Sequence, residues 1–269
     1  MWLVVLPLAA AAVTVRYDDN ACVGGAALFV SVHEANLRSA PGVDAPAVAQ
    51  LPLGTAVTAV ERLADTEVSG RSGAWCMVKL ADGRAGAMFS TTLTAHRLQA
   101  DLDEDGVPED IFVSYNKDHR LVVGVSDPNG GVGAVDLGVQ QDGGGFLDQA
   151  DVTLPADLGV PLLRVYVAGS EMCGGFSREL YVAWRNGPDG LARGAEVLRG
   201  ISGADAPVYT HTTFSFKARK KQVVVVETFG ESREDGPSAE DITTTTLRFD
   251  GLVYHEIARN KRHEGPPRE

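Results

Sequence analysis

Short β-type segments separated by turn residues recur along almost the whole chain, and this pattern restricts the fold more than any other feature. After residue 100 we identify eight of them: DIFVSYN, RLVVGVSD, LLRVYVAG, RELYVAWRN, HTTFSFKA, QVVVVETF, TTTTLRFD and LVYHEI. Each is rich in Val, Ile, Thr or aromatic residues and is bounded by Gly, Pro, Asp or Asn, as strands are. Residues 192–199, ARGAEVLR, form at most a helical turn. We therefore predict an all-β chain.

The region 27–95 predicts a small barrel. It contains five short β-type segments, with a tight turn at Pro52 and Gly54 and a hairpin turn at Asp82-Gly83. Short strands packed this densely along the chain are typical of small closed sheets. We expect residues 97–258 to form a second, larger and mainly antiparallel β domain, either partly propeller-like or a sandwich, followed by a mobile tail at 259–269.

Four separated landmarks in the first region resemble the bacterial SH3 (SH3b) domain. They are N-x-R-x-x-P at 36–41, L-x-x-G at 51–54, G-x-W-x-x-V at 73–78 and G-x-x-G at 83–86. The resemblance implies an SH3-like barrel that does not catalyse and that, in relatives, binds cell-wall peptides or partner proteins. It also implies ligand contacts through Trp75, Phe89 and Arg38, and through a long loop at 61–73.

The segment DLDEDGVPED at 101–110 predicts a metal-binding loop. Asp101, Asp103 and Asp105 occupy positions 1, 3 and 5, Gly106 permits a sharp turn at position 6, and position 9 is Glu109. We expect the backbone carbonyl of Val107 to complete a set of oxygen ligands of the kind calcium prefers. Position 12 is Phe112, inside a β-type segment, so the loop is not an EF-hand.

This loop resembles the calcium loops at the head of FG-GAP and VCBS β-repeats, which lead directly into a strand. The resemblance implies a structural calcium ion that ties the turn to the sheet. An acidic turn without an ion and a site for another divalent cation are the alternatives.

The charge of the chain argues against nucleic acid as a partner. The formal net charge is -12, and residues 101–157 contain 13 acidic residues against two basic ones. An acidic surface repels nucleic acids and anionic membranes. We expect a peptide or a cell-wall component as the partner instead.

The N-terminus predicts export to the periplasm or the medium. Residues 1–15 are apolar, and the small residues at 9–12 resemble a signal-peptide cleavage site. This run is too short for a membrane-spanning helix, which needs about 20 residues. We therefore predict a signal segment at 1–21 and no membrane span; a buried first strand is the alternative. Cys22, Cys76 and Cys173 allow three different single disulfides, of which Cys22–Cys76 would staple the N-terminal segment to the first domain.

Motifs for catalysis are lacking in the sequence. It has no G-x-S-x-G, no C-x-x-C and no phosphate-binding glycine loop. We therefore predict a noncatalytic binding protein. The alternative is a cell-wall hydrolase whose barrel provides targeting, with Cys173 or the pair Glu171 and Glu179 as candidate catalytic residues. A purely structural subunit is a third possibility.

Overall fold

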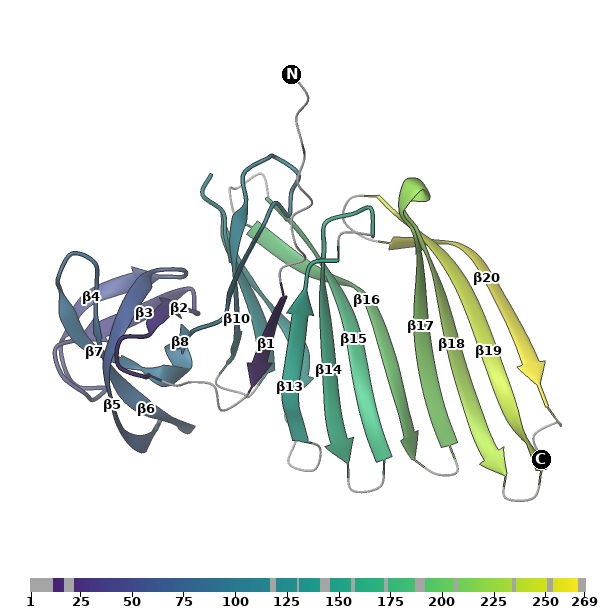
Figure 1. Cartoon of the computed structure of the whole chain (residues 1–269), viewed down its shortest axis with the longest axis horizontal. Helices are drawn as coiled ribbons and strands as arrows, with labels where there is room; N and C mark the ends of the chain where they lie inside the picture. The colour runs from purple at the N-terminus through teal and green to yellow at the C-terminus, as the bar shows by residue number, and fades with distance from the viewer. Residues whose placement is uncertain are drawn as a thin grey trace.

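The computed structural model describes residues 12–16, 22–116, 120–129, 131–140, 146–155, 158–171, 174–186, 192–205, 208–233, 236–250 and 254–265. In these ranges the regular structure is almost entirely β (Figure 1), so the prediction of an all-β fold is confirmed. Two short 3-10 turns, η1 (Ser90–Thr92) and η2 (Ala218–Lys220), are the exceptions in this part of the chain. None of the described helices has the length and apolar character needed to cross a membrane.

The first sheet curls into a barrel-like body. Its seven strands are β2 (Ala27–Val30), β3 (Glu34–Arg38), β4 (Ala47–Pro52), β5 (Ala56–Val68), β6 (Arg71–Lys79), β7 (Ala85–Phe89) and β8 (Leu93–Thr94). They are arranged in the order β4-β3-β7-β6-β5-β2-β8 and enclose an apolar core that includes Leu37, Val78 and Met88. Gly86 is required where β7 passes β3, because a Cβ atom there would lie 2.3 Å from the Arg38 carbonyl oxygen.

The segment 61–73 is not the loop that we predicted. β5 continues to Val68, and β6 begins at Arg71, so the segment is the outer part of a long hairpin. Ser69 and Gly70 form its turn with φ values of 53° and 75°, as a two-residue hairpin turn of the primed types requires. Two bulges in the β5–β6 pairing interrupt the alternation of side chains between the two faces of the sheet, so the sequence pattern did not indicate a hairpin here.

A disulfide joins Cys22 to Cys76, with 5.9 Å between the two Cα atoms. Cys76 lies on β6, and both cysteines belong to the core of the barrel-like sheet. The bridge therefore fastens the segment before β2 to the middle of the sheet. It is the first of the three pairings that the sequence allows, while Cys173 lies outside the described residues.

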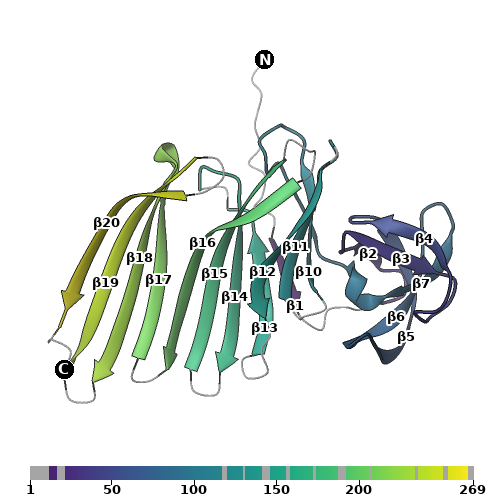
Figure 2. The same cartoon turned by 180° about the vertical axis from the view of Figure 1, so that it is seen from behind.

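Two further sheets pack face to face as a sandwich. The smaller has the order β12-β11-β10-β9, with β9 (Arg97–Ala100), β10 (Glu109–Tyr115), β11 (Arg120–Ser126) and β12 (Val132–Gln140). It lies against the first strands of a nine-stranded sheet: β1 (Ala12–Arg16), β13 (Phe146–Thr153), β14 (Leu162–Glu171) and β15 (Gly174–Asn186). Ile111 and Val123 from one sheet and Val152 and Val165 from the other share one core. Figure 2 shows the smaller sheet from its outer side.

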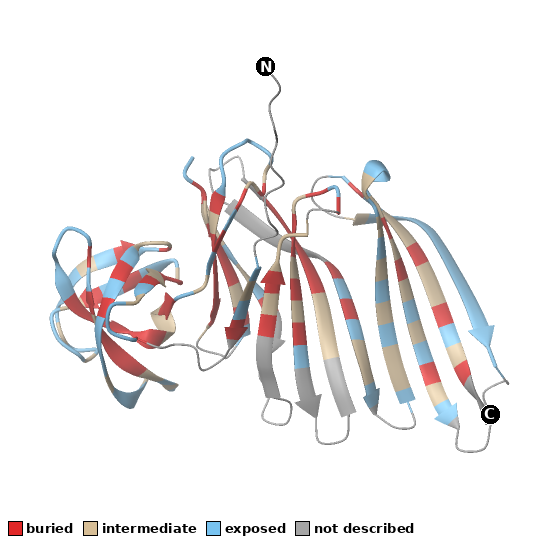
Figure 3. Cartoon of the chain, viewed as in Figure 1, coloured by how far each residue is buried: buried red, intermediate tan, exposed pale blue. Residues whose placement is uncertain are grey.

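The nine-stranded sheet continues beyond the sandwich as a single layer. Its remaining strands are β16 (Ala192–Asp205), β17 (Val208–Lys217), β18 (Gln222–Arg233), β19 (Gly236–Phe249) and β20 (Tyr254–Glu264). In Figures 1 and 2 no second sheet covers β17 to β20, and β17 carries no buried residue (Figure 3). One end of this part has a small core of its own, in which Val223 and Val225 pack near Leu158 and Val160.

The structure differs from the sequence-based expectations in three places along this sheet. Residues 192–199 are not a helical turn but part of β16, where pairing with β15 outweighs the weak local strand signal. Most of the expected tail 259–269 belongs to β20, because backbone pairing with β19 needs no apolar side chains. Within the expected signal segment, residues 12–16 form β1, which pairs with β13 and buries Val15. Residues 1–11 and 17–21 lie outside the described part.

The barrel-like body is in direct contact with the sandwich. The rings of Phe29 on β2 and Phe112 on β10 lie 5.5 Å apart, and the guanidinium of Arg97 lies 5.3 Å from the Phe29 ring centroid. Gly54 turns with a φ of +82° beside the Phe112 ring, which a Cβ atom at this position would approach to 3.0 Å. Thr94 Oγ1 donates to the carbonyl of Val113 at 2.6 Å. These contacts anchor β10 to the barrel just after the acidic loop.

Candidate ligand groove and metal site

Two aromatic side chains form the floor of a groove on the barrel. Trp75 on β6 and Phe89 on β7 are direct cross-strand partners, and their ring centroids lie 5.5 Å apart at an angle of 62°. Each is 8% exposed, and with Ala87 they form an apolar cluster separate from the main barrel core. The alternation along β6 explains this separation, because Cys76 and Val78 face the main core while Trp75 faces the opposite side.

A cavity of about 260 Å³ opens above this floor. One wall is β3, with Glu34, Asn36 and Arg38, and another is the β5–β6 hairpin, with Val68 and Arg71. Val43, 49% exposed, lies on the rim. The structure therefore brings the three predicted ligand contacts, Arg38, Trp75 and Phe89, into one cavity.

Some polar side chains of the groove have hydrogen-bond partners within the protein, and one does not. Arg38 Nη1 donates to the Ala45 carbonyl at 2.7 Å, and Gln50 Nε2 donates to Glu34 Oε2 at 2.7 Å. Arg71 Nε is buried and has no acceptor within the described residues. Sequence reasoning did not single out Arg71 or Glu34. The only signal for Arg71 was its place within 61–73, which we expected to line the site.

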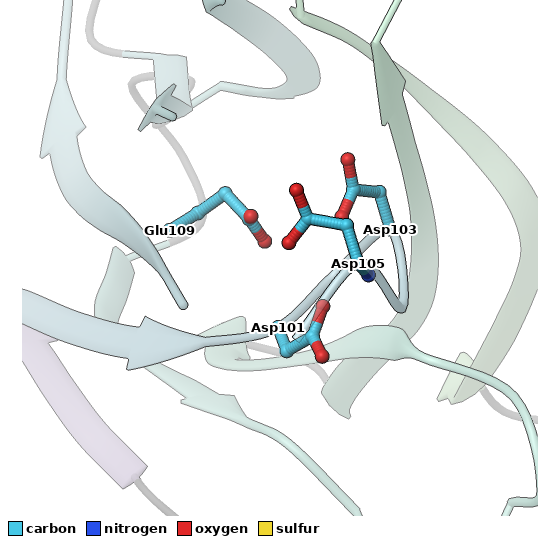
Figure 4. Close-up of side chains that lie close together, drawn as sticks. All are labelled: Asp101, Asp103, Asp105 and Glu109. Atoms are coloured by element: carbon cyan, nitrogen blue, oxygen red, sulfur yellow. The ribbon is translucent and has the colours of Figure 1, made fainter. Parts of the chain in front are cut away.

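The acidic loop gathers four carboxylates around one point (Figure 4). Asp101, Asp103 and Asp105 come from the turn between β9 and β10, and Glu109 is the first residue of β10. One oxygen of each lies within 4.8 Å of the others. Gly106 turns the chain with a φ of +89°, as its place at position 6 predicted.

Hydrogen bonds from the backbone hold these side chains inside the turn. The amide of Gly106 donates to Asp101 Oδ2 at 2.9 Å, that of Asp105 to Asp103 Oδ1 at 3.2 Å, and that of Val107 to Asp105 Oδ1 at 2.7 Å. The expected role of the Val107 carbonyl as a ligand stays a prediction. The backbone of the turn therefore fixes the positions of these acids.

Two buried oxygens of the cluster lack a protein partner. Glu109 is 2% exposed; its Oε2 accepts from the amide of Leu102, whereas its Oε1 has no partner in the described part of the chain. Asp101 Oδ1 is buried and unpartnered in the same way. A buried carboxylate oxygen without a hydrogen bond is costly, so both atoms suit a cation.

Burial and the closeness of the other carboxylates raise the pKa of two members of the cluster, Glu109 and Asp103. Burial, with repulsion from Asp103 and Asp127, raises the pKa of Glu109 to about 7. Burial also raises the pKa of Asp103, with repulsion from Asp105, Asp127 and Asp101, against a backbone hydrogen bond that lowers it. A divalent cation would remove this repulsion, and hard oxygen donors suit calcium better than softer metals.

A second turn reaches the cluster from the end of β11. Asp127, 5% exposed, lies next to Glu109 because Asp110 pairs with Ser126 across the two strands. Asn129 Nδ2 donates to Asp105 Oδ2 at 2.8 Å, and the Asn129 amide donates to Asp127 Oδ1 at 2.6 Å. Sequence reasoning missed both residues, because only the β10–β11 register places this turn beside the acidic loop.

The candidate catalytic residues have other surroundings. Glu179 accepts hydrogen bonds from Arg164 and from Tyr181, so it is engaged in an ion pair on the face of the large sheet. Cys173 and the side chain of Glu171 lie outside the described residues.

Comparisons of the chain with protein-family models, with curated proteins and with solved structures gave no match.

Proposed function

We propose that this chain is a noncatalytic binding protein whose SH3-like barrel holds an extended peptide or a cell-wall component in the groove over Trp75 and Phe89. One observation supports this most directly: the cavity joins an aromatic floor to polar side chains from two separate elements. Ligand sites combine apolar surface with a few polar groups in this way. The groove contacts the ligand, and the sandwich holds the barrel through Phe112.

A matched pair of valines tests the groove. Val43 is 49% exposed on its rim, whereas Val48 on β4 is 48% exposed and is not among the lining residues. Val43→Asp should reduce co-sedimentation with purified bacterial cell walls and the binding of short peptides, and Val48→Asp should leave both unchanged. Equal binding by the two variants would contradict the assignment of the site.

We also propose that calcium occupies the acidic cluster and acts as a structural brace. The unpartnered oxygens of Glu109 and Asp101 support this role. An ion there would join the loop to the first residue of β10, and thus to the strand that carries Phe112. Calorimetric titration of chelated protein should give a calcium-binding signal that the double variant Asp103→Asn, Asp105→Asn loses; an unchanged signal would rule the site out.

Export to an oxidising compartment is the third part of the proposal. The apolar run of residues 1–11 supports it, and so does the disulfide Cys22–Cys76, since disulfides persist mainly outside the cytosol. Because β1 pairs with β13, any cleavage of a leader must leave this strand on the mature chain.

A further inference from the structure

We propose that the groove selects ligands that carry a carboxylate, and that Arg71 is the residue that binds it. This inference rests on the proposed function of the groove and specifies the chemistry of its ligand. Arg38 lies in the same cavity and provides a second guanidinium group. The ligand is therefore a short extended peptide segment with an acidic side chain or a free C-terminus.

The first argument is the lack of a counter-ion. Three other arginines near the barrel have one: Arg62 pairs with Asp65, Arg84 with Asp82, and Arg97 with Asp110. By contrast, Arg71 Nε is buried without an acceptor among the described residues. A buried donor without a partner is costly, and a ligand oxygen would remove that cost. In a chain of net charge -12, an arginine left without such a partner is unexpected.

The second argument is the arrangement of the charges. Arg71 begins β6 beside the hairpin turn, and Arg38 ends β3, so the two come from different walls of one cavity. The bond from Arg38 to the Ala45 carbonyl uses Nη1 and leaves other donors of this guanidinium available. Guanidinium groups bind carboxylates through two parallel hydrogen bonds, which gives direction as well as affinity.

The third argument is the surface between the charges. Trp75 and Phe89 offer an apolar floor on which a side chain or backbone next to the carboxylate can pack. Glu34, held by Gln50, lies in the same cavity and can accept a hydrogen bond from a peptide amide. A volume of about 260 Å³ lies just below the range of about 300–1,000 Å³ found for drug-sized ligands, so a short segment fits.

Three peptides of equal length test the proposal. They are acetyl-Ala-Val-Glu-Ala-amide, acetyl-Ala-Val-Gln-Ala-amide and acetyl-Ala-Val-Gln-Ala with a free C-terminus. Binding is measured by NMR titration of the full chain, followed at the backbone amides of Trp75 and Phe89. We expect at least tenfold tighter binding of a charged peptide than of the neutral one, since a hydrogen bond to a charged group contributes about this much. The two charged peptides distinguish a side-chain carboxylate from a terminal one.

Variants then test the role of Arg71. Arg71→Gln should remove most of the preference for the charged peptide, because only the guanidinium of Arg38 then lines the cavity, and Arg71→Lys should keep more of it. Arg62→Gln, on the same hairpin but outside the cavity, should keep all of it. Spectra of the free variants show whether each is folded.

Each failure has a distinct meaning. If all three peptides shift the groove amides equally, carboxylate selection is wrong and the groove assignment remains. If the preference survives Arg71→Gln undiminished, the role of Arg71 is wrong. If no peptide shifts these amides, the proposed peptide-binding function is contradicted as well.

Discussion

Glu109 should make the metal-free protein less stable at alkaline pH than at acid pH. Its pKa is raised from 4.5 to about 7 in the folded chain. Because the unfolded chain releases this proton at lower pH, the contribution to stability is fully present below about pH 4.5 and is lost as the pH rises through 7. Each pH unit between 4.5 and 7 lowers the free energy of unfolding by about 1.36 kcal/mol, so the total loss is about 3 kcal/mol above pH 7.

Calcium should reverse this effect. A bound ion needs the ionised carboxylate and offsets the repulsion that raises its pKa. At a calcium concentration one hundred times the dissociation constant, binding adds about 2.7 kcal/mol to the free energy of unfolding. The protein with calcium should therefore be about as stable at pH 8 as the chelated protein at pH 5.

The assay is urea unfolding at pH 5 and pH 8, with a chelator or with calcium, for wild type and Glu109→Gln. The variant should lose most of the difference between the two pH values in chelator, keep a smaller slope from Asp103, and lose most of the stabilisation by calcium. Glu104→Gln is the control, because Glu104 is an exposed carboxylate of the same loop outside the cluster. If Glu109→Gln behaves like Glu104→Gln, the cluster does not bind an ion in the way we propose.

Three further perturbations test the scaffold. Cys22→Ser should lower the free energy of unfolding by about 4 kcal/mol, because the bridge spans 54 residues of the unfolded chain; urea unfolding without reductant measures this, and an unchanged midpoint would argue against the bridge. Phe112→Ala should lower the free energy of unfolding by about 3–5 kcal/mol, because its ring packs between Phe29 and Gly54. Thermal unfolding measures this change. A loss below about 1 kcal/mol would mean that this ring does not hold the barrel and the sandwich together. N-terminal sequencing of the mature protein should find a start at or before Ala12, since a later start would remove β1 from its pairing with β13.

Local sequence was sufficient for much of the fold. The runs rich in Val and Thr, such as those of β11 and β18, are strands as predicted, because their composition suits a pleated sheet whatever its neighbours are. Gly54, Gly83 and Gly106 all adopt the positive φ values that their predicted turns require. The four acids of the loop converge because their spacing along a single turn already brings them together.

Long-range pairing accounts for what sequence could not predict. β16 contains glycines and charged residues, and its conformation depends on pairing with β15. Asp127 reaches the acidic cluster, and Arg71 the groove, through the register of hairpins with no marker in the local sequence. For both candidate sites the sequence therefore indicated the residues of one segment, while those that neighbouring strands bring beside them were missed.

The uncovered part of the large sheet should open in order from its free edge. β20 is held to β19 mainly by the backbone ladder and carries mostly exposed charged and polar side chains, whereas β18 and β19 also share the small core around Val223 and Phe249. Separating β20 exposes little apolar surface, whereas separating β13 or β14 would disrupt the shared core of the sandwich. The free energy of local opening thus rises from β20 toward the strands of the sandwich. The edge at β20 can fray while the barrel-like body, which carries the groove, stays folded.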